Sequence, residues 1–112
     1  MIATMQATPR NVSDEITSTI AANHVVLFMK GSPQYPLCGF SAAAAKMLAD
    51  AGVSDYAYVN VLEDNLIREG IKHYSAWPTI PQLYVNQEFI GGADIMHELQ
   101  QTGELTRLLA SK

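Results

Sequence analysis

The residue of this chain with the strongest potential for chemistry is Cys38, its only cysteine. It follows a loop rich in glycine and proline over 31–36 and begins an alanine-rich segment over 38–50, which predicts a helix. Backbone N–H groups and the dipole at a helix N-terminus stabilise a thiolate, and Lys30, just before the loop, could add positive charge. Free cysteines are more often small buried hydrophobes. The place of Cys38 between a loop and a helix favours a reactive thiol.

Three positions after Cys38, where a dithiol oxidoreductase would carry its second cysteine, the chain has Ser41. With a single cysteine no intramolecular disulfide can form, and a cysteine-rich zinc site is excluded. We expect Ser41 to make a local hydrogen bond at the start of the helix. Gly39 has no side chain, which leaves space beside the sulfur for a bulky group.

Composition and charge narrow the classes of protein. The 112 residues carry a formal net charge of −4, which argues against nucleic-acid binding and against a negatively charged membrane surface as partner. No apolar run approaches the ~20 residues of a membrane span. Residues 1–9 lack the basic and apolar segments of a signal peptide, so we expect a cytoplasmic location, where a lone thiol stays reduced. His24, His73 and His97 have no ligand-like spacing to Cys38 and are expected to be surface or half-buried residues.

Helices and strands that would position Cys38 alternate along the chain. Residues 1–10 are expected to be a tail and residues 11–112 one domain. Hydrophobic periodicity and breaker residues predict helices at 12–22, 38–50, 65–74, 94–101 and 104–110, and strands at 25–29, 56–61, 82–85 and 88–90. Strands separated by helices imply a parallel pair, and a tight turn at Asn86-Gln87 closes an antiparallel hairpin. The sequence therefore predicts an α/β fold with a four-stranded mixed sheet flanked by helices. Cys38 would lie at the carboxyl end of the first strand, where such sheets bind ligands.

Three motifs in the same order resemble one family. Cys38-Gly39-Phe40-Ser41, preceded by Met29-Lys30-Gly31-Ser32-Pro33, is similar to the active-site segment of the monothiol glutaredoxins of the CGFS type. Trp77-Pro78-Thr79-Ile80-Pro81-Gln82 and Gly91-Gly92-Ala93-Asp94-Ile95 match the same family at the right spacing. The resemblance covers roughly residues 12–110 and implies a single-domain member with the thioredoxin-like glutaredoxin fold.

The resemblance implies a glutathione site, whose first half pairs with the glycine carboxylate and the cysteinyl part of glutathione. Lys30 and Arg68 resemble the cations that bind the carboxylate, although Arg68 taken alone suggests solvated surface charge. Ile80 precedes Pro81, which the family holds in the cis form, so the Ile80 backbone would face the cysteinyl part. We interpret Trp77-Pro78 as core packing and a rigid turn.

The second half of the implied site binds the γ-glutamyl end. Gly91-Gly92 lets the backbone approach a ligand, and the N–H groups of Ala93 and Asp94 would hold the γ-glutamyl carboxylate at a helix start. The Asp94 carboxylate would take the ammonium group, or serve as the helix N-cap, or both. Many family members carry a second cysteine where this chain has Ala93, so a disulfide between that position and Cys38 is not available here.

The resemblance also implies binding and transfer of a [2Fe–2S] cluster. Such a cluster needs four thiolate or equivalent ligands, and one chain offers only Cys38. Two chains and two glutathione thiols complete the set, so a glutathione-bridged homodimer is the expected cluster-bound form, with Cys38 as the metal ligand. The partner could instead be a BolA-like protein, which would supply a histidine. Apo iron–sulfur proteins would receive the cluster.

Two other functions remain open. The first is a glutathione-dependent thiol–disulfide oxidoreductase, of weak activity, that removes glutathione from mixed disulfides with Cys38 as nucleophile. The conformation of the loop over 31–37 would decide between this activity and cluster transfer. The second is an adaptor without a cofactor, which would bind a helical partner through exposed Phe40 and Trp77. The adaptor leaves Lys30 and Asp94 unexplained.

Overall fold

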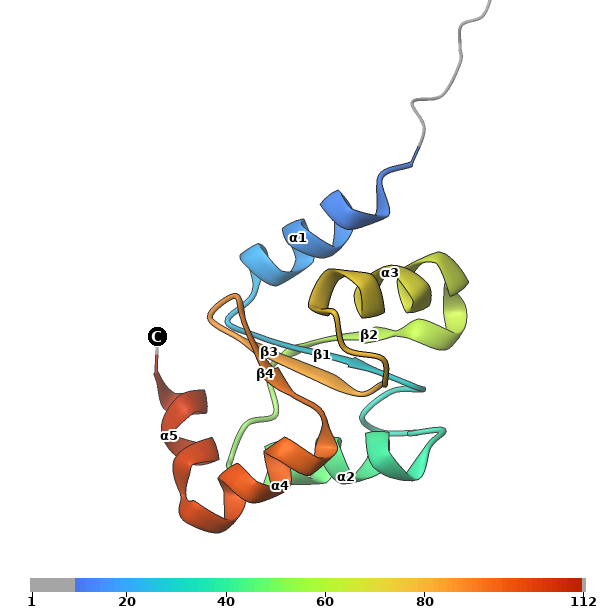
Figure 1. Ribbon diagram of the computed structural model, residues 1–112. Coiled ribbons are helices and arrows are strands. Elements are labelled where there is room, and N and C mark those ends of the chain that lie inside the picture. Colours follow the sequence, from blue (N-terminus) through green and yellow to red (C-terminus); the bar gives the residue numbers. More distant parts are fainter. Residues whose placement is uncertain (1–9, 112) are drawn as a thin grey trace, which may run out of the picture.

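The computed structural model describes residues 10–111, and over this range helices and strands follow one another in the order expected from the sequence (Figure 1). The elements are α1 (Val12–Ala22), β1 (Val25–Met29), α2 (Gly39–Asp50), β2 (Ala57–Asn60), a one-turn 3-10 helix (Val61–Glu63), α3 (Asn65–Ser75), β3 (Gln82–Val85), β4 (Glu88–Gly91), α4 (Ala93–Thr102) and α5 (Glu104–Ala110). The predicted α/β class with a four-stranded mixed sheet is confirmed, and the arrangement is the one that the family resemblance implied.

The sheet has the strand order β2-β1-β3-β4, with β1 parallel to β2 and antiparallel to β3. In the antiparallel hairpin of β3 and β4 the turn residues Asn86 and Gln87 have φ angles of 51° and 70°. A two-residue type I′ turn requires positive φ at both positions, so the predicted hairpin is confirmed. This order makes β1 a central strand whose carboxyl end leads into the loop before Cys38 (Figure 1).

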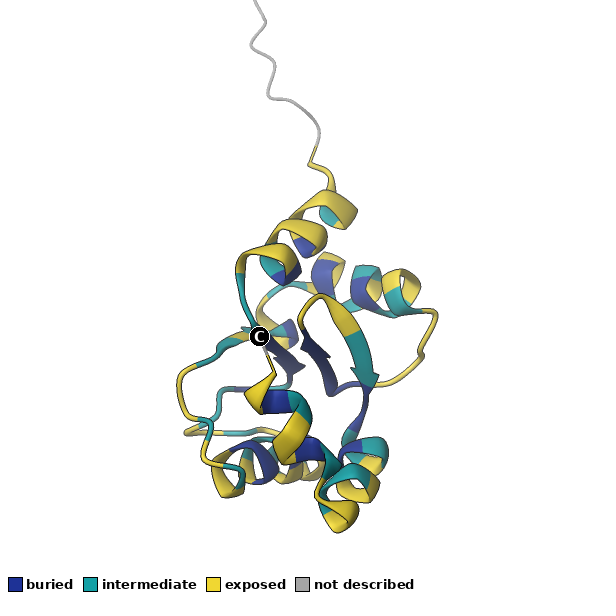
Figure 2. Ribbon diagram, turned by 90° about the vertical axis from the view of Figure 1, so that its left-hand side faces the viewer, coloured by how far each residue is buried: buried dark blue, intermediate teal, exposed yellow. Residues whose placement is uncertain are grey.

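Strand β1 is buried on both faces and separates two hydrophobic cores. Val25, Leu27 and Met29 belong to the core that contains residues of α2, α4 and α5. Val26 and Phe28 belong to the core that contains residues of α1 and α3. The alternation follows from the pleat of the strand, and burial of both faces explains the uninterrupted apolar sequence. Figure 1 shows the helices on the two sides of the sheet, and Figure 2 shows their buried residues turned toward it.

Several element boundaries differ by one residue from those predicted, and two of these differences have a clear local cause. The strand predicted over 56–61 ends at Asn60, because the Asn60 side chain accepts hydrogen bonds from the N–H of Leu62 at 3.0 Å and of Gly31 at 2.9 Å. These bonds turn the chain into the 3-10 helix and tie it to the loop after β1. Helix α2 begins one residue after Cys38, which is left as the helix N-cap.

The predicted tail, residues 1–10, lies outside the described residues except for Arg10. The Arg10 guanidinium forms ion pairs with Glu15 of α1 at 2.7 Å and with Asp64 at 2.6 Å. Asp64 also caps α3, because its carboxylate accepts from the N–H groups of Leu66 and Ile67. Arg10 therefore joins the start of α1 to the start of α3. Within residues 10–111, no helix is both long and apolar enough to cross a membrane.

Candidate functional site

Cys38 lies at the N-terminus of α2 with an extended backbone, at φ −157° and ψ 139°. Its carbonyl accepts the first helical hydrogen bond, from the N–H of Ala42 at 2.9 Å. The backbone N–H of Ser41 lowers the pKa of the Cys38 thiol most, partial burial opposes it, and the Phe40 N–H and the Lys30 charge lower the pKa further. The net pKa is below the ordinary value, so more of the thiol is in the nucleophilic thiolate form near neutral pH. Both influences expected from the sequence, the helix start and Lys30, act on the sulfur.

The end of β1, the loop after it and the start of α2 form the first wall of the site, and hydrogen bonds between these segments hold the thiol in place. The backbone N–H of Lys30 donates to the Ser41 hydroxyl at 3.0 Å, and the Lys30 carbonyl accepts from the N–H of Leu37 at 2.9 Å. Ser41 is fully buried. The sequence predicted only a local hydrogen bond at the helix start, but the Ser41 hydroxyl also accepts from a residue eleven positions earlier. Gly31 has a φ of +90°, and a Cβ there would lie 2.5 Å from the Tyr35 carbonyl oxygen, so this loop closes only with glycine.

The loop between α3 and β3 forms a second wall of the site. Its Ile80-Pro81 peptide is cis, as the family resemblance implies. The carbonyls of Trp77 and Thr79 each accept a hydrogen bond of 3.1 Å from the side-chain amide of Gln82. Because both bonds come from a fully buried side chain, the backbone of this wall is held from inside the protein.

The start of α4 forms the third wall. Gly92 is the N-cap of α4, so Asp94 lies within its first turn and is not the N-cap considered from the sequence. A Cβ on Gly92 would lie 3.1 Å from the Pro81 carbonyl oxygen and 3.6 Å from the Trp77 indole nitrogen. The missing side chain therefore lets the second and third walls approach each other. The free N–H groups of the first turn of α4 favour an anion at this end.

The three walls enclose one cleft of about 370 Å³. All the residues expected at the site line it: Lys30, Cys38, Arg68, Ile80, Pro81, Ala93 and Asp94. They come from five separate segments of the chain, which the fold brings together. The cleft thus holds a thiolate-prone sulfur, basic side chains, and a helix N-terminus with an exposed carboxylate. A second groove, between α1 and α3, has about 380 Å³ but gathers no comparable set of reactive groups.

Comparison with known proteins agrees with this arrangement. Residues 25–90 match the family described as glutaredoxin. The chain is 57% identical over 96 residues to the mitochondrial monothiol glutaredoxin-5 of Lachancea kluyveri, covering 84% of this chain and 67% of that protein. It is 49% identical over 94 residues to the probable monothiol glutaredoxin 2 of Rickettsia typhi, covering 84% of each. The chain belongs to the monothiol glutaredoxin family.

The structural comparison supports the same assignment. The solution structure of reduced apo GrxS14 from poplar superimposes with a TM-score of 0.73 at 42% sequence identity, over 86% of this chain and 87% of that one. The chain spans about two thirds of the length of some curated relatives, such as the mitochondrial monothiol glutaredoxin-5 of Saccharomyces cerevisiae, of which it covers 64%. We therefore treat the activity and partners of such longer proteins only as proposals for this glutaredoxin.

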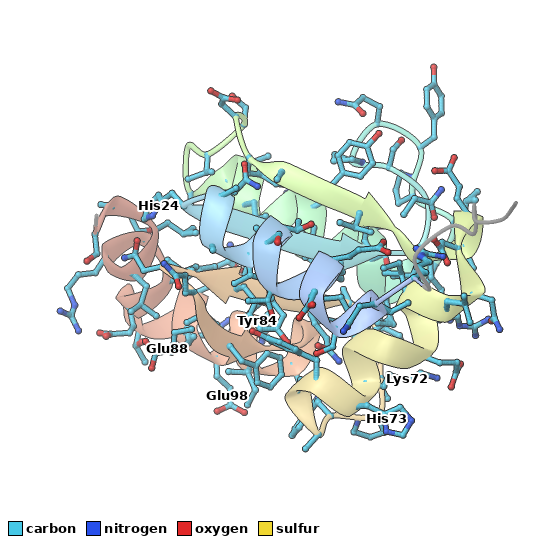
Figure 3. The ribbon with its side chains drawn as sticks, turned by 90° about the horizontal axis from the view of Figure 1, so that it is seen from above. His24, Lys72, His73, Tyr84, Glu88 and Glu98 are labelled. Carbon is cyan, nitrogen blue, oxygen red and sulfur yellow. The ribbon has the colours of Figure 1, made fainter. Side chains whose placement is uncertain are left out.

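One basic residue of this glutaredoxin site was missed from the sequence. Lys72 lines the cleft together with Arg68, one helical turn earlier on α3, and Figure 3 shows Lys72 on that helix beside His73. Its ammonium group pairs with Glu69 at 3.1 Å, and its side chain is 27% exposed. The sequence did offer a signal for Lys72: it lies four residues after Arg68, and this spacing places both side chains on one face of a helix.

Trp77 and Pro78 also differ from the interpretation made from the sequence. Both line the cleft rather than only the core, and Trp77 is 39% exposed. The indole ring packs on Phe89 of β4 at a centroid distance of 5.9 Å, which leaves its other parts available to a ligand. Phe40, beside Cys38, is 64% exposed and lines the cleft as well.

The histidines of this glutaredoxin lie outside the cleft, and two of them form hydrogen bonds elsewhere in the fold. The His24 ring contacts the Asn86 side chain at 2.7 Å and the Leu109 carbonyl at 3.0 Å, which joins the hairpin turn to α5 (Figure 3). His97 pairs with Gln101 on α4 at 3.3 Å, and His73 is exposed on α3. Among residues 10–111 no three histidine, cysteine or carboxylate side chains are grouped as a metal site would need.

Proposed function

We propose that this glutaredoxin binds glutathione in the cleft beside Cys38 and carries a [2Fe–2S] cluster between two copies of the chain for delivery to apo proteins. The observation that carries the proposal is the set of charged groups that line one cleft. Lys30 after β1 and the basic side chains of α3 line it, together with the thiolate-prone Cys38 and the α4 N-terminus with Asp94. Glutathione has two carboxylates, one ammonium group and a central thiol, so its groups complement this set.

The basic side chains that line the cleft support binding of the glycine carboxylate. Lys30, Arg68 and Lys72 come from two different segments and line the same cleft. Charge-assisted hydrogen bonds to a carboxylate are about twice as strong as neutral ones. The Lys72–Glu69 ion pair is partly exposed, so a bound carboxylate can compete with Glu69 for the ammonium group at small cost.

The remaining walls support binding of the other two parts of glutathione. The γ-glutamyl carboxylate would accept from the N–H groups of Ala93 and Asp94, and its ammonium group would pair with the Asp94 carboxylate. The cysteinyl part would lie along the backbone at Ile80, which places the glutathione sulfur near Cys38. Gly92 leaves room for this pose, because a side chain there would fill the space below Trp77.

The cluster is cargo that needs more ligands than one chain has. Four ligands are required, residues 10–111 contain no grouped set, and the whole sequence has one cysteine. Cys38 is partly exposed, and a Cβ on Gly39, the next residue along the chain, would meet nothing within 4 Å outside its own chain neighbours and helix backbone. Two copies of Cys38 and two bound glutathione thiols would complete the set. Tyr35, Leu37 and Phe40, all more than 60% exposed and within three positions of Cys38 in the sequence, would be covered in such a dimer.

A mixed assembly would use the same groups. In it a BolA-like protein would replace the second copy and contribute the other two ligands, including a histidine, and Cys38 with one glutathione would remain as ligands. The recipient apo proteins, the absence of nucleic-acid and membrane partners, and the cytoplasmic location stay predictions from the sequence.

Anaerobic reconstitution with iron, sulfide and glutathione tests the proposal directly. We expect a red-brown protein with charge-transfer absorption that elutes as a dimer only when glutathione is present. Dithiothreitol in place of glutathione supplies thiols without the two carboxylates and should give no stable dimer. Cys38→Ser should remain colourless while keeping its far-UV circular dichroism. A coloured Cys38→Ser dimer, or equal reconstitution with dithiothreitol, would contradict the proposal.

The lowered pKa of Cys38 favours a second candidate, reduction of mixed disulfides. In this reaction the Cys38 thiolate attacks the glutathione sulfur of a glutathionylated protein and releases the protein thiol. A second glutathione then attacks the Cys38–glutathione disulfide, and glutathione disulfide leaves. Ser41 cannot replace that second glutathione. A colourless monomer that removes glutathione from substrates at a good rate would favour this activity over cluster transfer.

A further inference from the structure

We propose that Gln82 is a positioning residue for glutathione, which holds the loop over 76–81 in its binding shape through a buried polar clamp. The clamp consists of Gln82, Tyr84 and Ser75. The proposal rests on the proposed glutathione site and assigns to residues outside the cleft the task of shaping one of its walls.

The Gln82 side chain uses its full donor capacity on this loop. It is fully buried in β3, and its amide group donates one hydrogen bond of 3.1 Å to the Trp77 carbonyl and another of 3.1 Å to the Thr79 carbonyl. Its amide oxygen accepts from the Tyr84 hydroxyl at 3.2 Å. A reversed amide would place its oxygen against two carbonyl oxygens, so this orientation is the one that the surroundings permit.

Tyr84 fixes the orientation of that amide. It lies two residues after Gln82 on the same face of β3, is 2% exposed, and packs edge-on against Phe28 at 5.7 Å and against Tyr74 at 6.1 Å (Figure 3). Burial raises the pKa of Tyr84 to about 12, so the hydroxyl keeps its proton and remains a donor at all ordinary pH values.

Ser75 connects the clamp to the end of α3. Its hydroxyl accepts from the Trp77 N–H at 3.1 Å, donates to the Ile71 carbonyl at 3.0 Å, and lies close enough to the Tyr84 hydroxyl to affect its pKa. Trp77 is therefore bound through its N–H by Ser75 and through its carbonyl by Gln82. Ala76, between them, has a left-handed backbone with φ 56°, which reverses the chain at this point.

A polar residue at this position needs an explanation, because every residue of β3 is buried and the others are Leu83, Tyr84 and Val85. A buried amide without partners costs free energy, and an apolar residue would pack here without that cost. The partners of Gln82 are two loop carbonyls that accept a hydrogen bond from no other group among residues 10–111. Gln82 thus ties the loop backbone to the central sheet and fixes its position at Trp77 and Ile80, two residues that line the cleft.

The test compares Gln82→Met, which keeps the length and apolar bulk of the side chain but donates nothing, with two controls. Val85→Ala removes apolar bulk from the same strand without touching the loop, and gives a variant of reduced stability. Tyr56→Phe removes a hydroxyl from a half-buried tyrosine that packs against the other core. Tyr84→Phe removes the hydroxyl that orients the Gln82 amide and repeats the test should Gln82→Met fail to fold.

Two readouts are used at a temperature where each variant is folded. The first is the equilibrium constant for exchange of the Cys38 thiolate with glutathione disulfide, divided by that for exchange with hydroxyethyl disulfide. In each exchange one disulfide forms and one breaks, and the difference between the two small disulfides is the same for every variant. A change in the ratio between variants therefore measures a change in the noncovalent contacts of glutathione. The second is amide hydrogen exchange at residues 77, 79 and 80, supported by acrylamide quenching of Trp77, the only tryptophan.

We expect Gln82→Met to lower the glutathione preference about tenfold and to speed exchange in the loop, as a missing buried hydrogen bond that positions a ligand would do. Tyr84→Phe should act in the same direction, by about threefold. Val85→Ala and Tyr56→Phe should leave the preference unchanged. An unchanged preference in Gln82→Met, or a loss no larger than that in Val85→Ala, would overturn the proposal.

A wild-type protein that shows no preference for glutathione would instead count against the proposed function. In that case the exchange readout still decides whether Gln82 orders the loop: faster exchange at residues 77–80 in Gln82→Met alone supports the clamp, and exchange equal to that of wild type overturns it.

Discussion

The backbone N–H of Lys30 donates a hydrogen bond of 3.0 Å to the Ser41 hydroxyl, across eleven positions of sequence. This bond joins the end of β1 to the first turn of α2. It brings the Lys30 charge and the Ser41 N–H to the same sulfur, where both lower the pKa of Cys38. The residue that replaces the second cysteine of a dithiol protein therefore has a structural task in this chain.

Replacing Ser41 by alanine tests that task. Ser41→Ala removes the acceptor of the Lys30 N–H inside the protein, and an unsatisfied buried donor costs about 1–3 kcal/mol. We expect the free energy of unfolding in urea to fall by that amount. Ser54→Ala, in an exposed loop, should change it by less than about 0.5 kcal/mol. Equal effects of the two substitutions would contradict the role of the hydroxyl.

The pH dependence of Cys38 alkylation tests the charge of Lys30. Because the pKa of Cys38 is lowered, we expect the iodoacetamide rate to reach half its maximum at a pH below the ordinary cysteine value of 9.0. Lys30→Met removes a positive charge, which should move this midpoint upward and slow alkylation at neutral pH by about threefold. Lys46→Met is the control and should leave the curve in place, because the Lys46 side chain is 75% exposed and its ammonium group pairs with Asp50.

Substitution of Lys72 tests whether the basic side chains of the cleft bind glutathione. Lys72→Met should weaken glutathione binding by about three- to tenfold, and this loss should shrink as ionic strength rises. Glu69→Gln removes the carboxylate that competes for Lys72 and should strengthen binding slightly. Titration by calorimetry at two salt concentrations measures both effects. Equal affinities of the two variants at low salt would place Lys72 outside the binding site.

Two glycines are expected to respond in opposite ways to alanine. Gly39 lies in the first turn of α2, and a methyl group added there would meet nothing within 4 Å, so Gly39→Ala should keep or raise stability by about 0.5 kcal/mol. The methyl group would add bulk to the residue next to Cys38 in the chain and should reduce cluster-bound dimer formation. Gly70→Ala would place its Cβ 2.6 Å from the Val12 side chain, which should destabilise the α1–α3 contact but leave dimer formation intact in the folded protein. Unimpaired dimer formation by Gly39→Ala would count against the shared cluster.

The ion pairs of Arg10 predict a pH dependence of stability. Arg10 lowers the pKa values of Glu15 and Asp64 from their ordinary values of 4.5 and 3.8. Folded-state values below those of the unfolded chain mean that the stabilisation is complete above about pH 5 and is lost as the pH falls through the folded-state values. Arg10→Met should therefore lower the urea midpoint at pH 7 and flatten its decline toward pH 3. Parallel curves for the two proteins would show that the ion pairs do not contribute.

The positions of helices and strands could be predicted closely from the sequence, because their signals are local. The apolar run of β1 and the alanine-rich α2 each indicate their structure within a few residues. The end of β2 could not be predicted in this way. It depends on the Asn60 side chain, which bonds both Leu62 nearby and Gly31 on another segment.

The residues of the candidate site also fall into those that could be predicted from the sequence and those that could not. Cys38 at a helix start follows from the sequence alone, and the family resemblance named six of the other residues that line the cleft. Lys72 and Trp77 were missed or assigned to other roles, because a lysine on a polar helix face and a tryptophan before a proline are common in many proteins. Their place in the cleft depends on the packing of α3 and the following loop against the sheet.

By itself, the sequence determined the order of the elements, the hairpin turn and the residue that carries the reactive sulfur, since periodicity, turn chemistry and helix propensity act over a few neighbouring residues. Only the tertiary structure decided that Ser41 bonds Lys30 and that Gln82 bonds the loop carbonyls of Trp77 and Thr79. Each of these contacts forms because a buried polar group must find a partner, and which partner lies within reach depends on how distant segments pack.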